Sequence, residues 1–319
     1  MNAQIWYRHA LLNRLQSLAL LGAIGGFMAL LGWLVWGVFG VIGLLLVAMW
    51  LLLFNPAARP QLIMRMYRAS LLTSWEAPGL QKVLHELTRR AELPAVPELY
   101  YVPSRMVNAF AVGTPGQAAI AVTDGLLRAL DLREIAGVLA HEVSHIRNND
   151  LRVMGIADLF SRLTSFLSLF GQILLLLNLP LLLLSGMAIN WFAILVLIFA
   201  PSLSVLAQLG LSRTREYDAD LNAAQLTGDP EGLARALVKI ERVHGSFLER
   251  LLLPGRGIPE PSTLRTHPRT EDRVRRLMDL RAGGPTAWAE QSDLLSVPRH
   301  PLRASPVQLP RWHINGLWH

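Results

Sequence analysis

The chain has 319 residues, of which 52% are hydrophobic and 17% charged, whereas soluble domains carry about 25% charged residues. This composition excludes a disordered or collagen-like chain and disfavours an ordinary soluble enzyme. The net charge is +7, but the basic residues flank apolar stretches. The sequence has no basic groove interleaved with aromatic residues of the kind that would indicate nucleic-acid binding. The absence of cysteine excludes disulfides, thiolate metal ligands and a cysteine nucleophile.

Two long uncharged segments predict membrane-spanning hairpins. Residues 15–58 and 163–212 contain no Asp, Glu, Lys or Arg, and one bilayer crossing needs roughly 20 apolar residues. The expected helices are 17–36, 38–54, 163–184 and 188–210, with turns near Gly37–Gly40 and Asn178–Asn190. Arginines lie at the outer ends of both segments, which predicts that these ends are cytoplasmic. The first segment is too long for a cleavable signal peptide.

The segment between the hairpins predicts a soluble part with helices and a small sheet. Leu80, Val83, Leu84 and Leu87 recur at helical spacing, and Pro94 ends that helix. The β-rich runs are Leu99–Val102, Val107–Val112 and Ala118–Val122. Asp131 followed by Glu134 predicts a capping box, with a helix running to about Asn149. Further helices are expected over 213–226, after Asp229 and after Pro268, followed from about residue 283 by a tail without periodicity.

The motif His141-Glu142-Val143-Ser144-His145 lies on that capped helix. Positions i and i+4 share one helix face, so both imidazoles can bind one ion while the Glu142 carboxylate reaches a water beside it. The alternative is a pair of surface histidines. The apolar stripe running from Ile135 to Ile146 borders both imidazoles, which favours zinc binding over this alternative.

A catalytic zinc needs a third protein ligand and one open position. Glu216, in the acidic and basic stretch 212–220, is the candidate third ligand. Asp220 lies four residues further on the same helix face, where a carboxylate can hold the free nitrogen of a ligating histidine. The competing interpretation is a solvated patch that faces lipid headgroups, and spacing alone leaves the two open.

Four motifs, taken in order, resemble the HtpX heat-shock membrane proteases, gluzincin metallopeptidases related to the CAAX prenyl endopeptidases. The motifs are Pro103-Ser104 with Asn108-Ala109-Phe110-Ala111, the zinc helix His141–His145, the segment Arg213–Asp220, and Thr266-His267-Pro268. The hydrophobic hairpins also lie where this family has them. The resemblance covers about residues 10–282 and leaves the tail uncovered.

The resemblance implies a zinc metalloendopeptidase with one Zn²⁺ per subunit. Its ligands would be His141, His145 and Glu216, and Glu142 would be the general base. The tetrahedral oxyanion needs a donor besides zinc, and His267 is the candidate. The backbone of Asn108, Ala109 and Phe110 would bind substrate as an extended strand. In this family the substrates are misfolded or damaged membrane proteins, which implies a role in quality control and the stress response.

The sequence therefore predicts an α-helical membrane protein with a mainly α gluzincin domain that carries a small β-sheet. The expected organisation is a hairpin (1–58), a first catalytic part (59–162), a second hairpin (163–212), a second catalytic part (213–282) and a tail (283–319). The expected location is the plasma (inner) membrane, with the catalytic domain cytoplasmic. Expected partners are the bilayer and protein substrates, and the sequence does not specify oligomeric state.

Three other functions share features of this sequence. An intramembrane protease also carries the two-histidine motif, but within an apolar span, whereas Arg133, Glu134, Arg147 and Asp150 surround it in this chain. A CAAX-type prenyl-protein endopeptidase is a closer alternative, although that branch resembles longer chains with more membrane helices. A non-enzymatic membrane scaffold would not need the complete set of ligands and base.

Overall fold

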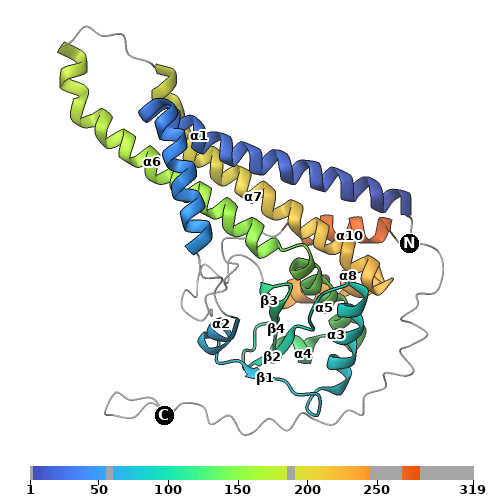
Figure 1. Ribbon diagram of the computed structural model, residues 1–319. Helices are drawn as coiled ribbons and strands as arrows, with labels where there is room; N and C mark the ends of the chain where they lie inside the picture. Colours follow the sequence, from blue (N-terminus) through green and yellow to red (C-terminus); the bar gives the residue numbers. More distant parts are fainter. Residues whose placement is uncertain (1–2, 55–59, 185–190, 245–267, 281–319) are drawn as a thin grey trace, which may run out of the picture.

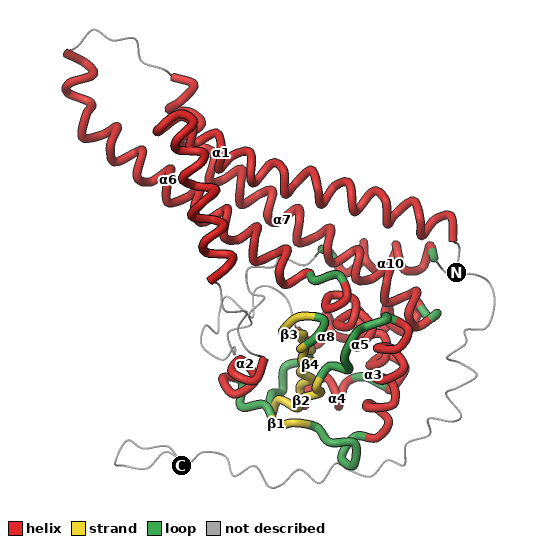
Figure 2. The backbone as a smooth tube through the Cα atoms, viewed as in Figure 1, coloured by secondary structure: helices red, strands yellow, loops and turns green. Residues whose placement is uncertain are grey.

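The computed structural model describes residues 3–54, 60–184, 191–244 and 268–280 (Figure 1). Long helices form an extended arm, and a mixed body of helices and strands lies at one end of it (Figure 2). The arm consists of α1 (Ala3–Phe54), α6 (Asp150–Leu184) and α7 (Trp191–Thr227). Each of these helices packs against the other two.

Helix α1 is two helices joined by a sharp break. Trp36 and Gly37 leave helical geometry, and Gly37 has a φ of 62°, which glycine adopts without steric cost. The chain then folds back on itself (Figure 1). A side chain at Gly40 would place its Cβ 2.1 Å from the carbonyl oxygen of Gly32, so the two halves approach more closely than any larger residue allows. The break agrees with the predicted division, but the first helix begins at Ala3 rather than at residue 17.

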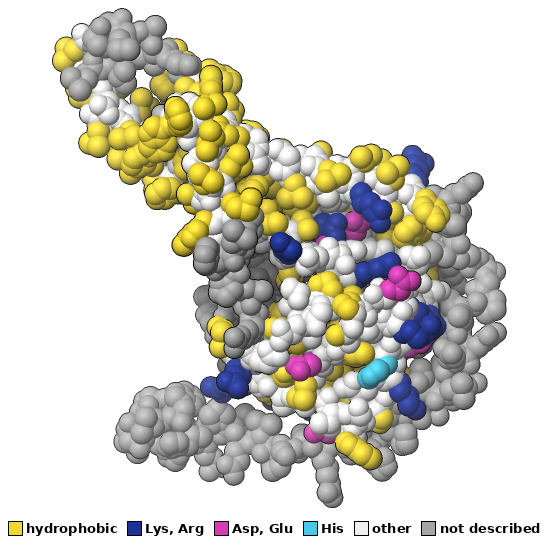
Figure 3. All heavy atoms as spheres, in the orientation of Figure 1, with side chains coloured by type: hydrophobic (Ala, Val, Ile, Leu, Met, Phe, Trp, Pro, Cys, Tyr) yellow, Lys and Arg dark blue, Asp and Glu magenta, His cyan; other side chains and the backbone are white. Residues whose placement is uncertain are grey.

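The arm has the length and composition of a membrane-spanning bundle. Ile5–Leu34, Asp150–Pro180 and Trp191–Thr227 are each long and apolar enough to cross a bilayer, and Trp36–Trp50 is a shorter apolar helix. Apolar side chains cover the outer end of the arm, while most charged side chains lie on the body (Figure 3). Large exposed apolar residues of this kind are a stable surface only when lipid or protein covers them.

The body contains a four-stranded sheet in the order β1-β2-β4-β3. Its strands are β1 (Ser70–Leu71), β2 (Glu98–Val102), β3 (Ala109–Thr114) and β4 (Gln117–Thr123). β2 and β4 are parallel, and β3 and β4 form an antiparallel hairpin. The three predicted strands are confirmed. β1 was not predicted, because two exposed residues carry no alternation of polar and apolar side chains.

The helices of the body include α5, which carries the two-histidine motif. They are α2 (Pro60–Met66), α3 (Pro78–Arg90), α4 (Asp124–Ala129), α5 (Leu132–Arg147), α8 (Pro230–His244) and α10 (Thr270–Asp279). α5 packs against β3, α3, α7 and α8, so it is the centre of the hydrophobic core. The predicted capping box is present, since Asp131 and Glu134 each accept a hydrogen bond from the other's backbone N–H. The short helices α2 and α4 were not predicted.

Two helices of the arm continue without interruption into the body. α6 begins at Asp150, directly after α5, and the predicted helices 188–210 and 213–226 are one helix, α7. The predicted boundaries after residues 162 and 212 therefore lie inside helices, because the charged segments keep the same helical path as the apolar ones. The division into five segments stays a prediction, and its last segment, 283–319, lies outside the described residues.

Candidate metal centre

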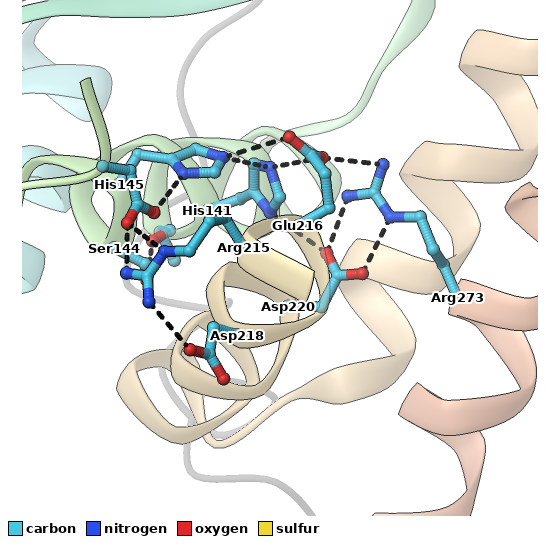
Figure 4. Close-up of polar contacts among 10 residues, drawn as sticks. His141, Ser144, His145, Arg215, Glu216, Asp218, Asp220 and Arg273 are labelled. Carbon is cyan, nitrogen blue, oxygen red and sulfur yellow. Dashed lines mark hydrogen bonds and ion pairs between the residues drawn. The ribbon is translucent and has the colours of Figure 1, made fainter. Parts of the chain in front are cut away.

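Two helices bring His141, His145 and Glu216 together. The histidines lie one turn apart on α5, and Glu216 projects from α7 (Figure 4). The two Nε2 atoms are 3.1 Å apart. The Glu216 carboxylate oxygens lie 3.5 Å from Nε2 of His141 and 3.6 Å from Nε2 of His145. One donor atom from each residue lies within 4.8 Å of the others, and all three side chains are buried.

The donor set fits a divalent cation such as zinc. Nδ1 of His141 lies 3.0 Å from Asp220 Oδ1, and Nδ1 of His145 lies 2.7 Å from Asp150 Oδ2. A proton on each Nδ1 satisfies these carboxylates and leaves a lone pair on each Nε2. Two nitrogen lone pairs and the Glu216 carboxylate then converge on one point. Such a group of acceptors repels itself unless a cation lies among them, and the combination of two imidazoles with one carboxylate suits zinc.

The electrostatic environment of His141 also favours positive charge at this point. Burial acts to lower the pKa of His141, but the Asp220 and Glu216 carboxylates outweigh it and raise this pKa to about 10. The same negative field attracts a metal cation. A metal ion must displace a proton to bind an imidazole nitrogen, so the field stabilises whichever cation occupies the site.

Asp150 is a residue of this centre that the sequence analysis did not assign. Asn149, between α5 and α6, has a φ of 56°, a left-handed conformation that asparagine tolerates better than most residues. This turn directs Asp150 back toward His145, and its carboxylate is 1% exposed. The signal was the Asn148-Asn149 pair after the motif, because asparagines at a helix end commonly form such turns.

Arg273 is a second unassigned residue. It lies on α10, is buried, and donates two hydrogen bonds of 2.7 Å to the two oxygens of Asp220. Its Nη1 is 3.4 Å from Glu216 Oε2. Burial lowers the pKa of Arg273, but the charge and hydrogen bonds of Asp220 outweigh it and raise this pKa. Sequence reasoning had no means of selecting it, since three further arginines lie within α10 or next to it.

The acidic stretch on α7 is not a solvated patch. Glu216 is 2% exposed and Asp220 is 4% exposed, and both face the histidines of α5 (Figure 4). The headgroup-facing alternative is therefore wrong for these residues. Glu142 follows His141 on α5, is half-buried, and adds to the negative field around Arg273. His267 lies outside the described residues.

The strand β3 forms one edge of the sheet and packs against α5. Asn108 lies opposite Thr123, and its carbonyl oxygen accepts a hydrogen bond of 3.1 Å from the Thr123 N–H. Bonding alternates along an antiparallel pair, so Phe110 also directs its backbone toward β4, whereas Ala109 and Ala111 direct theirs toward the outer edge. Among the described residues, no strand pairs with that edge. The Phe110 ring packs against Tyr67, 4.9 Å between centroids.

Comparisons with known proteins agree with this geometry. The sequence profile of peptidase family M48 matches residues 74–281. A protease HtpX homolog of Aquifex aeolicus is 39% identical over 244 residues, which are 69% of this chain and 77% of the relative. A protease HtpX homolog of Acaryochloris marina is 36% identical over 248 residues, 69% of this chain and 78% of the relative.

The crystal structure of Ste24p from S. mikatae is a more distant match. It is 20% identical to this chain with a TM-score of 0.38, and the match covers 85% of this chain and 66% of the Ste24p chain. The family assignment rests instead on the sequence matches, the apolar helices and the converging donors of His141, His145 and Glu216. The chain belongs to peptidase family M48 and is a membrane metallopeptidase of the HtpX type.

Proposed function

We propose that the protein is a membrane-integrated, zinc-dependent endopeptidase that cleaves misfolded or damaged membrane proteins. The observation that carries this proposal is the convergence of His141, His145 and Glu216 just beyond the uncharged, apolar part of α7. Ser212 is the last residue of the uncharged segment, and Glu216 is four residues further along α7. At 1.5 Å per residue, the metal centre lies only about 6 Å beyond that segment. Substrates that emerge from the bilayer would meet it first.

One Zn²⁺ per chain would be held by the two Nε2 atoms and the Glu216 carboxylate, with Asp220 and Asp150 orienting the imidazoles. When bound, the ion supplies a Lewis acid that polarises the scissile carbonyl and the attacking water. Glu142 accepts the proton of that water as its oxygen attacks the carbonyl carbon, and then delivers the proton to the leaving amine. His267 is proposed to donate a hydrogen bond to the oxyanion.

The substrate would bind as an additional strand along the outer edge of β3. Ala109 and Ala111 offer backbone N–H and C=O groups in that direction, and such hydrogen bonds are nearly independent of sequence. The expected contribution of Asn108 and Phe110 is different. Their backbones bond to β4 and hold the edge strand in place. Broad specificity of this kind suits the clearance of diverse damaged proteins better than the recognition of one prenylated motif.

A chelator-reversible cleavage assay tests the proposed function. The full-length protein, purified in detergent, should cleave a loosely folded protein such as casein, lose this activity in a chelator, and regain it with added Zn²⁺. A prenylated CAAX peptide provides the comparison substrate. Cleavage of the prenylated peptide alone would support the CAAX-type alternative, and metal-bound protein without any cleavage would support a scaffold.

We also propose that α1, α6 and α7 form two membrane hairpins, with both turns on the opposite side of the membrane from the metal centre. The fold-back at Gly37 and the pairing of α6 with α7 support this topology, as do the arginines at the other ends of the apolar segments. The protein would then lie in the inner membrane, with its metal centre on the cytoplasmic side.

Single cysteines in this cysteine-free chain test the topology. Phe39 lies just after the break in α1 and is exposed, and Lys82 is exposed on α3 in the body. In sealed inside-out vesicles, a membrane-impermeant maleimide should label Lys82→Cys and leave Phe39→Cys unlabelled until detergent is added. Gly40 and Ser144 are unsuitable positions because both are buried. Equal labelling of both variants before detergent addition would contradict the proposed topology.

A further inference from the structure

A continuous chain of polar contacts joins the first helix of the arm to a histidine of the metal centre. Nδ2 of Asn13 on α1 donates to Asp218 Oδ1 at 2.8 Å, and Asp218 Oδ2 accepts from Arg215 Nη1 at 3.1 Å. The Arg215 guanidinium also donates to Asp150 Oδ1. Asp150 Oδ2 lies 2.7 Å from His145 Nδ1. Figure 4 shows Arg215 between Asp218 and His145.

Each carboxylate in the chain uses one oxygen for each neighbour. Asp218 bonds Asn13 with Oδ1 and Arg215 with Oδ2, and Asp150 bonds Arg215 with Oδ1 and faces His145 with Oδ2. A change in the orientation of one carboxylate therefore breaks a contact on one side or the other. Hydrogen bonds in a buried network strengthen one another, and an unsatisfied member is costly.

The polar contacts from Asn13 to Asp150 are shielded from water. Asn13 is 4% exposed and Asp218 is 7% exposed, while the Arg215 side chain is 13% exposed. Water therefore cannot readily replace a lost contact. The first part of α1 is also held on α7 by a second bond, because Nε1 of Trp6 donates to the carbonyl oxygen of Leu221 at 3.3 Å. The N-terminal part of α1 is consequently fixed on α7, the helix that carries Glu216.

We propose that Asn13 is a positioning residue through which the N-terminal helix holds His145 in its metal-binding orientation. The inference rests on the proposed function, since it takes His145 as a ligand. Asn13 fixes the carboxylate of Asp218, which keeps Arg215 turned toward Asp150, and Asp150 in turn orients the imidazole. Residues that orient metal ligands typically change metal affinity by about 10- to 100-fold when they are replaced. Asn13 acts through three intermediates, so the lower end of this range is expected.

The test is the affinity of the full-length, detergent-purified protein for Zn²⁺, measured by competition with a chelator. Asn13→Leu, which removes the donor but keeps a good helix former of similar size, should raise the Kd for Zn²⁺ about 10-fold, and Asn13→Ala should do the same. Ser17→Ala is the matched control. Ser17 is buried one turn further along α1 but takes no part in the chain, so its replacement should leave the Kd within about 2-fold of the wild-type value.

Two measurements distinguish a positioning role of Asn13 from general support of the fold: the zinc affinity of a double variant and the stability and helix content of the metal-free protein. Because Asn13 acts only through Asp218, the double variant Asn13→Leu/Asp218→Asn should bind Zn²⁺ no more weakly than Asp218→Asn alone. Asn13→Leu leaves Asp218 Oδ1 without its donor, so the metal-free variant should have a lower Tm than Ser17→Ala. Its circular dichroism below that Tm should match the wild type, which establishes that the helices are retained.

Three outcomes would overturn the inference. The first is a Kd for Asn13→Leu equal to that of Ser17→Ala when the wild-type protein binds Zn²⁺ in the same assay. That result would leave the proposed function intact. The second is additive losses in the double variant. The third is a wild-type protein that binds no Zn²⁺ at all, which instead contradicts the metal site itself and the inference with it.

Discussion

Replacement of Glu142 by glutamine is expected to abolish nearly all cleavage while the protein keeps its metal. The amide has the shape of the carboxylate but cannot accept the proton of the attacking water. General base catalysis contributes about 10²–10⁴-fold, so kcat should fall by about that factor with KM little changed. The proposed ligands His141, His145 and Glu216 are untouched, and metal content measured by mass spectrometry should remain one Zn²⁺ per chain.

Ser144→Ala is the control for this variant. Ser144 lies between the two histidines on α5, is buried, and donates only to the carbonyl oxygen of Ala140 at 2.7 Å. Its replacement changes the same helical turn without removing a donor or acceptor from the metal centre, and activity should stay near the wild-type level. A Glu142→Gln enzyme that retained wild-type kcat would assign the base to another residue.

Replacement of Glu216 by alanine is expected to remove metal and activity together. Loss of a direct ligand should weaken Zn²⁺ binding by more than the roughly 100-fold that an orienting residue can cost. The two imidazoles alone leave the site open, and the Arg273 charge, 3.4 Å from Glu216, loses one of its two acidic partners. Zinc titration of the metal-free protein measures the loss of affinity, and circular dichroism establishes that the helices are retained.

Glu241→Ala provides the comparison for Glu216→Ala. Glu241 is an exposed residue of α8, and its replacement removes the same functional group from the surface of the body. It should leave zinc affinity and cleavage unchanged. If Glu216→Ala instead kept full zinc occupancy, the third ligand would have to be a different residue, and the geometry of the site would need another explanation.

The sequence was sufficient for the features that depend on local pattern. The long uncharged segments predicted the apolar helices, because charge is excluded wherever a helix faces lipid. The Asp131 and Glu134 spacing predicted the start of α5, since a capping box is made within one turn. The motif at His141 and His145 placed two donors on one helix face for the same reason.

Features that depend on contacts between distant segments were decided only by the tertiary structure. The sequence was equally compatible with a metal-binding Glu216 and with a solvated patch. The packing of α7 against α5 decided between them, because it buries the Glu216 carboxylate beside the histidines. Arg273 and Asp150 had no distinguishing pattern of their own. They acquire their roles because folding brings a buried charge next to an opposite one, and an unpaired buried charge is too costly to persist.

The link from Asn13 to His145 shows the same limit most clearly. Asn13 and Asp218 are 205 positions apart in the chain, and an asparagine near the start of an apolar helix indicates nothing about a metal site. The sequence by itself determined which residues have the chemistry to bind a cation and which helices can enter a bilayer. Only the tertiary structure decided which of those residues meet, because their meeting depends on how three long helices pack against one body.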